Sequence, residues 1–322
     1  MRVNALPRVR LAALPTPLVR AERAEAALGA GPIWIKRDDL TGFAFAGNKA
    51  RKLEFLLADA LERGCDVVLT GGGPGSNHCQ ATAAAARVAG LACRLVLYGE
   101  EPARPPANLR LARAFGADVA FTGDPDRSSV DGAIEEAAAS LAADGLRPAT
   151  IPRGGASPLG AVGYALAADE LGDQLAAALV EPSFVFVATG SSGTQAGLVA
   201  GSVGRSAPWQ IVGASVSRPP EESRRRVLEL AQGCAAILGL PPAGPPDVQV
   251  RDARGPGYRS ESQQGAAAAE LFARTEGLLL DRVFTAKAAG AMIEMLREGV
   301  DGPVVFLHTG GAATILDEGM DA

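Results

Sequence analysis

Residues 65–99, CDVVLTGGGPGSNHCQATAAAARVAGLACRLVLYG, decide the fold class of this 322-residue chain. A valine-rich apolar run leads into a glycine-rich turn, an alanine-rich stretch that stops at Gly90, and a second apolar run. The order predicts a strand, a helix and another strand. Two strands joined through a helix in this way lie parallel in one sheet.

The same alternation continues through most of the sequence. Further strands are expected at 32–38, 118–123, 182–190, 209–217, 278–281 and 303–311, and helices at 49–64, 106–116, 128–145, 194–205, 261–275 and 285–299. A proline- and glycine-rich passage over 241–257 is expected to be a long loop. The sequence therefore predicts an α/β fold with helices on both faces of parallel sheets, in two units that join near residue 150.

Composition narrows the class of protein. A hydrophobic content of 48% supports a large core, and the net charge of -5 without a basic block argues against nucleic-acid binding. The N-terminal residues lack the apolar core of a signal peptide, and no run reaches transmembrane length, so we expect a cytoplasmic protein with no membrane partner. Four scattered cysteines and only two histidines give no reason to expect a metal site.

Three glycine-bearing turns follow predicted strands, at 70–78, 188–197 and 308–311. Ligands bind at the carboxyl ends of parallel strands, where these turns are expected to lie. The turn at 190–194, GSSGT, precedes a helix and could present N–H groups and hydroxyls to an anion. It fits a helix cap equally well, so this stretch alone leaves both interpretations open. Loops that bind nucleoside triphosphates carry a lysine directly after the glycine-rich turn, and none stands there, so a loop of that type is disfavoured.

The turn at 70–78 departs from the dinucleotide fingerprint, because Ser76 stands where the third glycine belongs. An NAD-binding oxidoreductase is therefore disfavoured. Ser76, Asn77 and His78 instead fall at a predicted helix N-terminus, where Ser76 also fits an ordinary cap. The two histidines of the chain, His78 and His308, each lie beside one of the three turns.

Lysine is scarce, since 31 basic residues include only Lys36, Lys49, Lys52 and Lys287. Lys36 precedes Arg37-Asp38-Asp39 and is expected to pair with a carboxylate. Lys49 lies at the start of a predicted helix, with Lys52 one turn later, and one of the two is expected to be solvated. An amine at a helix start, near an anion-holding turn, suits a Schiff base with an aldehyde cofactor. Pyridoxal phosphate is consistent with this arrangement.

Several stretches together resemble one family. These are IKRDDLTGFAFAGNKARKLEFLL (35–57), SNH (76–78), TGSSGT (189–194), GLLLDRVFTAKA (277–288) and HTGG (308–311). They are similar to the D-cysteine desulfhydrase and 1-aminocyclopropane-1-carboxylate deaminase family, over about residues 12–314. The resemblance implies a pyridoxal-phosphate enzyme of fold type II, the tryptophan-synthase-β type. It also implies a homodimer.

The resemblance implies two doubly wound parallel-sheet domains with the cofactor in the cleft between them. The smaller domain would span 48–153, and the larger would combine 1–47 with 154–322. Lys49 matches the lysine that forms the Schiff base and later moves the α-proton, and Asn77 matches the partner of the phenolic oxygen. Thr309 matches the position that faces the pyridine nitrogen. The phosphate loop would comprise Thr189, Gly190, Ser191, Ser192, Gly193 and Thr194.

On the substrate side, the resemblance implies roles for Ser76, Asn77, His78, Tyr258 and Phe284. Ser76 would bind the substrate carboxylate, and it is counted with Lys49 and Tyr258 among the catalytic residues. Phe284 departs from the family, which usually has tyrosine there.

Other departures affect the substrate pocket. Thr285 replaces the glutamate that cyclopropane deaminases carry facing the pyridine nitrogen, which weakens the deaminase interpretation. Pro74-Gly75 and Gln80-Ala81 replace the family's Ile-Gln and Arg-Gln on either side of SNH, and we expect these changes to surround the substrate.

The resemblance therefore implies a carbon–sulfur lyase that removes a β-substituent from a small amino acid. D-Cysteine is the default substrate, and the products are pyruvate and ammonia. β-Replacement and an L-cysteate-type lyase in a specialised pathway stay open as alternatives, as does a catalytically silent pyridoxal-phosphate-binding protein.

Overall fold

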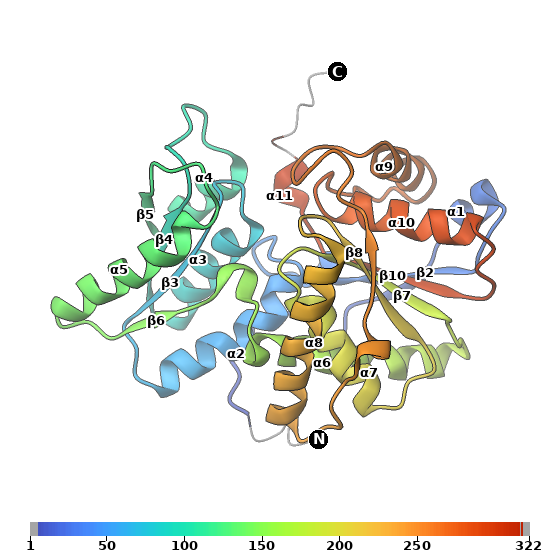
Figure 1. The fold of residues 1–322 in the computed structure, drawn as a ribbon, viewed down its shortest axis with the longest axis horizontal. Helices are drawn as coiled ribbons and strands as arrows, with labels where there is room; N and C mark the ends of the chain where they lie inside the picture. Colours follow the sequence, from blue (N-terminus) through green and yellow to red (C-terminus); the bar gives the residue numbers. More distant parts are fainter. Residues whose placement is uncertain (1–5, 316, 318–322) are drawn as a thin grey trace.

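A computed structural model describes residues 6–315 and residue 317 (Figure 1). Two sheets lie side by side, the smaller with α3, α4 and α5 and the larger with α6 to α10, while α2 runs between them (Figure 1). The helices are α1 (Glu22–Leu28), α2 (Asn48–Glu62), α3 (Asn77–Ala89), α4 (Ala107–Ala114), α5 (Ser129–Ala143), α6 (Pro158–Ala178), α7 (Gly193–Gly204), α8 (Pro220–Leu238), α9 (Gln263–Glu276), α10 (Thr285–Arg297) and α11 (Ala312–Ile315). Short 3-10 turns are η2 (Asp38–Leu40), η3 (Arg153–Gly155) and η4 (Pro245–Asp247).

The larger sheet has six strands in the order β1-β2-β10-β7-β8-β9. They are β1 (Leu18–Arg20), β2 (Ile33–Arg37), β10 (Val304–His308), β7 (Phe184–Thr189), β8 (Gln210–Ser215) and β9 (Gln249–Asp252). All neighbours are parallel except β1, which pairs antiparallel with β2 at the edge. Alternate side chains enter two cores: Val305 and Leu307 face α6, α7 and α8, whereas Val304 and Phe306 face α1, α9 and α10. The predicted cover on both faces is confirmed.

The smaller sheet has four parallel strands in the order β5-β4-β3-β6. They are β5 (Asp118–Phe121), β4 (Ala92–Leu97), β3 (Val67–Gly72) and β6 (Pro148–Thr150). One face packs on α2, α3 and α4, and the other on α5. Helix α2 also contributes Phe55 to the core of the larger part. Because α2 belongs to both cores, the domain boundaries at 48 and 153 stay a prediction.

Three expectations about elements were wrong or incomplete. In the described chain, residues 278–281 form no strand; Leu278 and Leu280 pack under helices, and the Asp281 carboxylate accepts the N–H of Phe284 at 2.7 Å to begin α10. The passage 241–257 contains η4 and β9 as well as loop. Strands β1 and β6 and helices α1, α6, α8 and α11 were not predicted. For β6 and the 21-residue α6, glycine and proline interrupt the local pattern.

Small residues let three helices approach closely. A Cβ placed on Gly197 of α7 would lie 2.2 Å from the Ala161 carbonyl oxygen of α6. One placed on Gly163 of α6 would lie 2.1 Å from the Arg51 carbonyl oxygen of α2. Both separations are shorter than any real contact, so only glycine fits these two crossings. Helix α6 is therefore wedged between α2 and α7.

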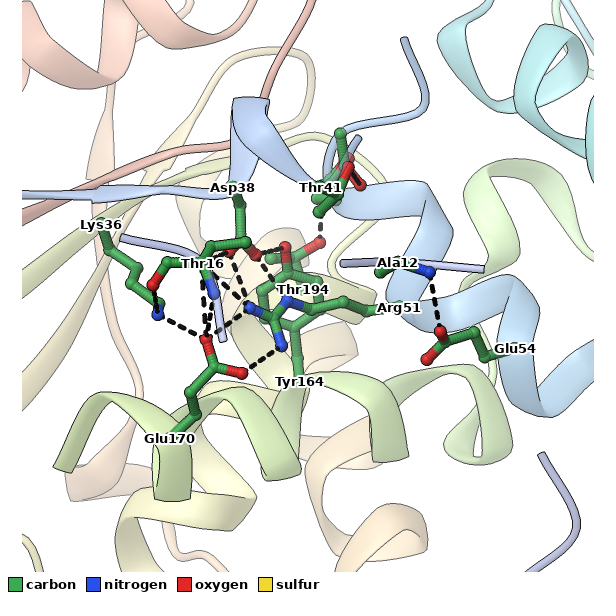
Figure 2. Close-up of polar contacts among 12 residues, drawn as sticks. Ala12, Thr16, Lys36, Asp38, Thr41, Arg51, Glu54, Tyr164, Glu170 and Thr194 are labelled. Atoms are coloured by element: carbon green, nitrogen blue, oxygen red, sulfur yellow. Dashed lines mark hydrogen bonds and ion pairs between the residues drawn. The ribbon is translucent and has the colours of Figure 1, made fainter. Parts of the chain in front are cut away.

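A buried ionic network joins α2 to β2 and α6 (Figure 2). The Arg51 guanidinium donates to both carboxylate oxygens of Asp38 at 2.9 Å and to Glu170 at 2.9 and 3.0 Å. Lys36 also donates to Glu170, so its expected pairing with a carboxylate is confirmed, although the partner lies on α6. Burial would raise the pKa of Asp38, but the Arg51 charge and the hydrogen bonds from Arg51, Tyr164 and Thr16 together outweigh it, so the net effect lowers that pKa.

Replacing Arg51 with methionine is expected to destabilise the fold by about 3–5 kcal/mol, because Asp38 would keep a buried charge without its cation. The measurement is the free energy of unfolding in urea. Arg63→Met is the matched control: it removes an exposed ion pair with Asp59 on the same helix and should cost at most about 1 kcal/mol. Equal losses in the two variants would contradict the role given to the network.

Candidate active site

A cavity of about 450 Å³ lies between the two sheets. The smaller part lines it with residues from 71–78, 127–135 and 150–154. The larger part contributes residues from 188–195, 217–218, 258–259, 281–284 and 309–311. The three glycine-bearing turns predicted at strand ends all reach this cavity, as the parallel topology requires.

Lys49 lies on the first turn of α2 and faces the cavity. The helix can begin here because Gly47 has φ 51° and no side chain: a Cβ would meet the Thr309 carbonyl oxygen at 2.2 Å. The Asn48 N–H donates to that same oxygen at 3.0 Å. Lys49 Nζ donates to Asn48 Oδ1 at 3.0 Å, and Asn48 Nδ2 donates to the Thr194 hydroxyl at 2.9 Å. Asn48 thus connects the lysine to the turn at 190–194.

Burial lowers the pKa of Lys49 to about 8, with the Asp281 charge acting in the opposite direction. At pH 7, Lys49 then carries a neutral amine in roughly a tenth of the protein molecules, a far larger fraction than for an ordinary lysine. Asp281 itself lines the cavity, although it was not among the residues predicted for the site. The sequence feature that could have pointed to Asp281 is its position directly after the apolar run LLL.

The turn Gly190–Thr194 passes into α7 with Ser192 at φ 74°, a conformation unusual for a residue other than glycine. Such a turn presents the free N–H groups of a helix N-terminus to a ligand. Ser192 Oγ is buried without a hydrogen-bond partner in the described structure. The predicted members Gly190, Ser191, Ser192 and Thr194 line the cavity. Thr189 and Gly193 do not, and the Thr189 hydroxyl donates to Gln195 at 2.7 Å.

Lys52 lies on the same face of α2 as Lys49 and is 1% exposed. The expectation that one of these lysines is solvated is therefore wrong for Lys52. Its Nζ donates to the Gly154 carbonyl at 3.3 Å and would lie 3.1 Å from a Cβ on Gly193. Within residues 6–315 it has no carboxylate partner, and burial and then Lys49 lower its pKa well below the usual value. A buried cation beside this turn fits the phosphate of pyridoxal phosphate.

Helix α3 begins at the second glycine-bearing turn. Ser76 caps it as predicted, with Oγ accepting the Cys79 N–H at 3.2 Å. Asn77 Oδ1 accepts from Asn108 Nδ2 at 2.9 Å and from Thr314 at 3.2 Å, which leaves its NH₂ group to donate elsewhere. That orientation suits the predicted contact with the cofactor's phenolic oxygen.

The two histidines differ in their surroundings. His78 lines the cavity, but it is buried, and its Nε2 lies 3.0 Å from the Thr70 hydroxyl. Burial and then the Lys49 and Lys52 charges hold its pKa well below the usual value, so the ring is neutral at pH 7. His308 is 3% exposed and does not line the cavity. Its Nε2 lies 3.2 Å from the Leu279 carbonyl oxygen, and its Nδ1 accepts the N–H of Gly310 at 3.3 Å.

Tyr258 and Phe284 form one wall of the cavity, with ring centroids 6.1 Å apart in an edge-to-face arrangement. Phe284 also lies close to the turn at 190–194, since a Cβ on Gly190 would lie 3.1 Å from its ring. Burial raises the pKa of Tyr258, so its hydroxyl stays protonated near neutral pH and can donate a hydrogen bond.

Thr309 lines the cavity as predicted, whereas Thr285 is buried in a hydrogen bond with Asp281. Pro74-Gly75 and Gln80-Ala81, which depart from the family pattern, were both expected to surround the substrate, but only the first pair reaches the cavity. Gly75 lines the cavity. Gln80 is turned away and donates to the Ala44 carbonyl, and Ala81 packs in the core of the smaller part.

The sequence of residues 9–310 matches the family described as pyridoxal-phosphate dependent enzyme. The chain belongs to that family.

Within it, the chain is 39% identical to the D-cysteine desulfhydrase of Yersinia enterocolitica, over 98% of this chain and 96% of the relative. It is 40% identical to the D-cysteine desulfhydrase of Salmonella choleraesuis, over 97% and 96%. A crystal structure titled as an ACC deaminase homologue superposes with a TM-score of 0.89 at 34% identity, covering 97% of this chain and 94% of that one. The family resemblance, the fold and the cofactor requirement expected from the sequence are confirmed.

The lowered pKa of Lys49 predicts how cofactor uptake depends on pH. Only the neutral amine attacks the aldehyde, so the rate at which apoprotein gains its visible absorption band should rise with pH and reach half its maximum near pH 8. Stopped-flow absorbance from pH 6 to 10 measures it. A midpoint near 10.5, the ordinary value for lysine, would contradict the site electrostatics.

Lys52→Met should weaken pyridoxal phosphate binding by about tenfold or more, since a charge-assisted contact to phosphate is worth about 1.5–3 kcal/mol. Pyridoxal, which lacks the phosphate, should bind the variant and the parent alike. Equilibrium titration of the absorption band measures both ligands. An equal loss for pyridoxal would mean that Lys52 acts through Lys49 instead.

Proposed function

We propose that the protein is a carbon–sulfur lyase that removes a β-substituent from a small amino acid, with D-cysteine as the reference substrate. The observation that carries the proposal is the placement of Lys49. Its amine, with a pKa of about 8, faces a cleft that offers an anion-binding turn on one side and the start of α3 on the other. The D-cysteine desulfhydrase relatives, aligned over nearly the whole chain, support the same reaction class.

The cofactor, when bound through Lys49, supplies an electron sink for the pair released at the substrate's α-carbon. The residues of the chain supply position and proton transfer. Ser76 and the N-terminus of α3 bind the substrate carboxylate. Lys49 Nζ receives the α-proton. The loss of the β-substituent leaves an enamine product, which water converts to pyruvate and ammonia.

Purified protein loaded with pyridoxal phosphate should release pyruvate and sulfide from D-cysteine in equal amounts. L-Cysteine and 1-aminocyclopropane-1-carboxylate serve as comparison substrates. Phe284→Tyr restores the hydroxyl that the family usually has, and it should raise kcat for D-cysteine if that hydroxyl donates a proton. A bound cofactor without turnover of any β-substituted amino acid would favour the silent binding protein instead.

We also propose that the protein is a cytoplasmic homodimer, on the strength of the family resemblance. Among the described residues, no helix is long and apolar enough to cross a membrane. Light scattering of the purified protein should give twice the chain mass of 32.8 kDa. A monomer would count against this part of the proposal.

A further inference from the structure

Asn108, the second residue of α4, lies behind the site and does not line its cavity. Its Nδ2 donates to Asn77 Oδ1 at 2.9 Å and to the Gly75 carbonyl oxygen at 3.0 Å. The side chain is almost completely buried, with 1% exposed. Asn108 can therefore act on the site through the residues that it contacts.

The Gly75 carbonyl oxygen fixes the direction of the Asn108 amide. The two ends of an amide side chain have the same shape, and hydrogen bonds decide which end is oxygen and which is nitrogen. A carbonyl oxygen can only accept, so the end of Asn108 that lies 3.0 Å from it is the NH₂ group. The second hydrogen of that group is the one donated to Asn77.

The direction of the Asn77 amide follows from that of Asn108. The end of Asn77 that lies 2.9 Å from Asn108 Nδ2 has to accept, so it is the oxygen. The Thr314 hydroxyl donates to the same oxygen at 3.2 Å. The reverse orientation would set one NH₂ group against another. Asn77 lines the cavity, and its NH₂ group is the end left to donate there.

The two donors to Asn77 come from the two parts of the molecule. Asn108 belongs to the smaller part, whereas Thr314 is on α11, which follows the last strand of the larger sheet. Asn108 Nδ2 also lies 3.4 Å from the Thr314 hydroxyl. Beyond α11, the Asp317 carboxylate accepts the Ala107 N–H at 2.6 Å, at the start of α4. These contacts hold the start of α4, and Asn108 with it, in place behind Asn77.

Packing alone does not account for an asparagine at position 108. Its Oδ1 is buried and has no hydrogen-bond partner among residues 6–315 and 317. A buried acceptor without a partner destabilises the folded state, and an apolar side chain of similar size would avoid that cost. An apolar side chain would not supply the donor that Asn77 receives.

The direction of the Asn77 amide has a chemical consequence for bound pyridoxal phosphate. A donor that reaches an ionised oxygen stabilises its charged form. An amide turned the other way would present its own oxygen and repel the charge. The direction of the amide therefore decides whether Asn77 favours or opposes the ionised form of the phenolic oxygen.

We propose that Asn108 is a positioning residue, which keeps the NH₂ group of Asn77 directed at the phenolic oxygen of the cofactor. Thr314 assists it from the larger part. The inference rests on the contact predicted between Asn77 and that oxygen. It does not depend on which amino acid the enzyme acts on.

The test is a visible absorption spectrum of the protein loaded with pyridoxal phosphate, recorded without substrate. The forms with an ionised and a protonated phenolic oxygen absorb at different wavelengths, so the ratio of their two bands reports on the contact. Asn108→Leu removes the donor and frees the Asn77 amide to turn. It should lower the ratio of ionised to protonated form by about tenfold, the loss of one charged hydrogen bond. Asn108→Asp should lower it further, because a carboxylate can only accept and reverses the amide.

Leu109→Ala is the matched control. Leu109 is the next residue of α4, is also 1% exposed, and packs in the core of the smaller part. Its truncation loosens the same helix but keeps the Asn108 amide, so the ratio should not change.

A double variant shows whether Asn108 acts through Asn77. Asn77→Ala removes the contact with the cofactor. Adding Asn108→Leu to it should leave the ratio at the value of Asn77→Ala alone. If the Asn108 variants fail to fold, Thr314→Val at a half-buried position removes the other donor, and it should lower the ratio by about threefold.

Three results would overturn the proposal. One is an unchanged ratio in both Asn108 variants or, where these do not fold, in Thr314→Val. Another is an equal change in Leu109→Ala, since the packing of α4 would then be the cause. The third is a further change when Asn108→Leu is added to Asn77→Ala. Because no substrate is present, none of these results depends on the proposed lyase function, which the release of pyruvate tests separately.

Discussion

The ion pair between Asp38 and Arg51 is the constraint on which the cleft depends. Arg51 follows Lys49 by two residues, so the two side chains project about 200° apart around α2. Anchoring Arg51 against Asp38 and Glu170 therefore holds the opposite face of the first turn, with Lys49, towards the cavity. Asp38 follows β2 directly, and Glu170 lies on α6, so the same network joins α2 to the larger sheet.

The charged side chains that line the cleft differ in their roles. Burial shifts the Lys49 amine towards its neutral form, which a nucleophile and base requires. Lys52 is also buried and lies against the turn that begins α7. Five arginines also line the cavity: Arg127, Arg153, Arg218, Arg226 and Arg259. Positive charge is thus concentrated in the cleft of a protein whose net charge is -5, where small anionic substrates would be attracted.

Local sequence patterns predicted most strands and helices, because each βα unit carries its own apolar period and glycine stops. They also placed Lys49 at a helix start, and Ser76 and Thr309 in turns that follow strands, and the fold brings all three to one cavity. Lys52 and Asp281 were missed because their significance lies in contacts with remote segments. Glu170 was missed for the same reason: its partner Lys36 is 134 residues away, and no local pattern encodes that pairing. The strand expected at 278–281 is absent; Asp281 instead accepts the N–H of Phe284, the residue before α10.

The most direct test of the account is the position of the covalent bond to the cofactor. Protein loaded with pyridoxal phosphate is reduced with borohydride, digested, and analysed by tandem mass spectrometry. The account predicts a phosphopyridoxyl group on Lys49, with Lys52 unmodified. Modification of Lys52 in place of Lys49, or of neither, would contradict it.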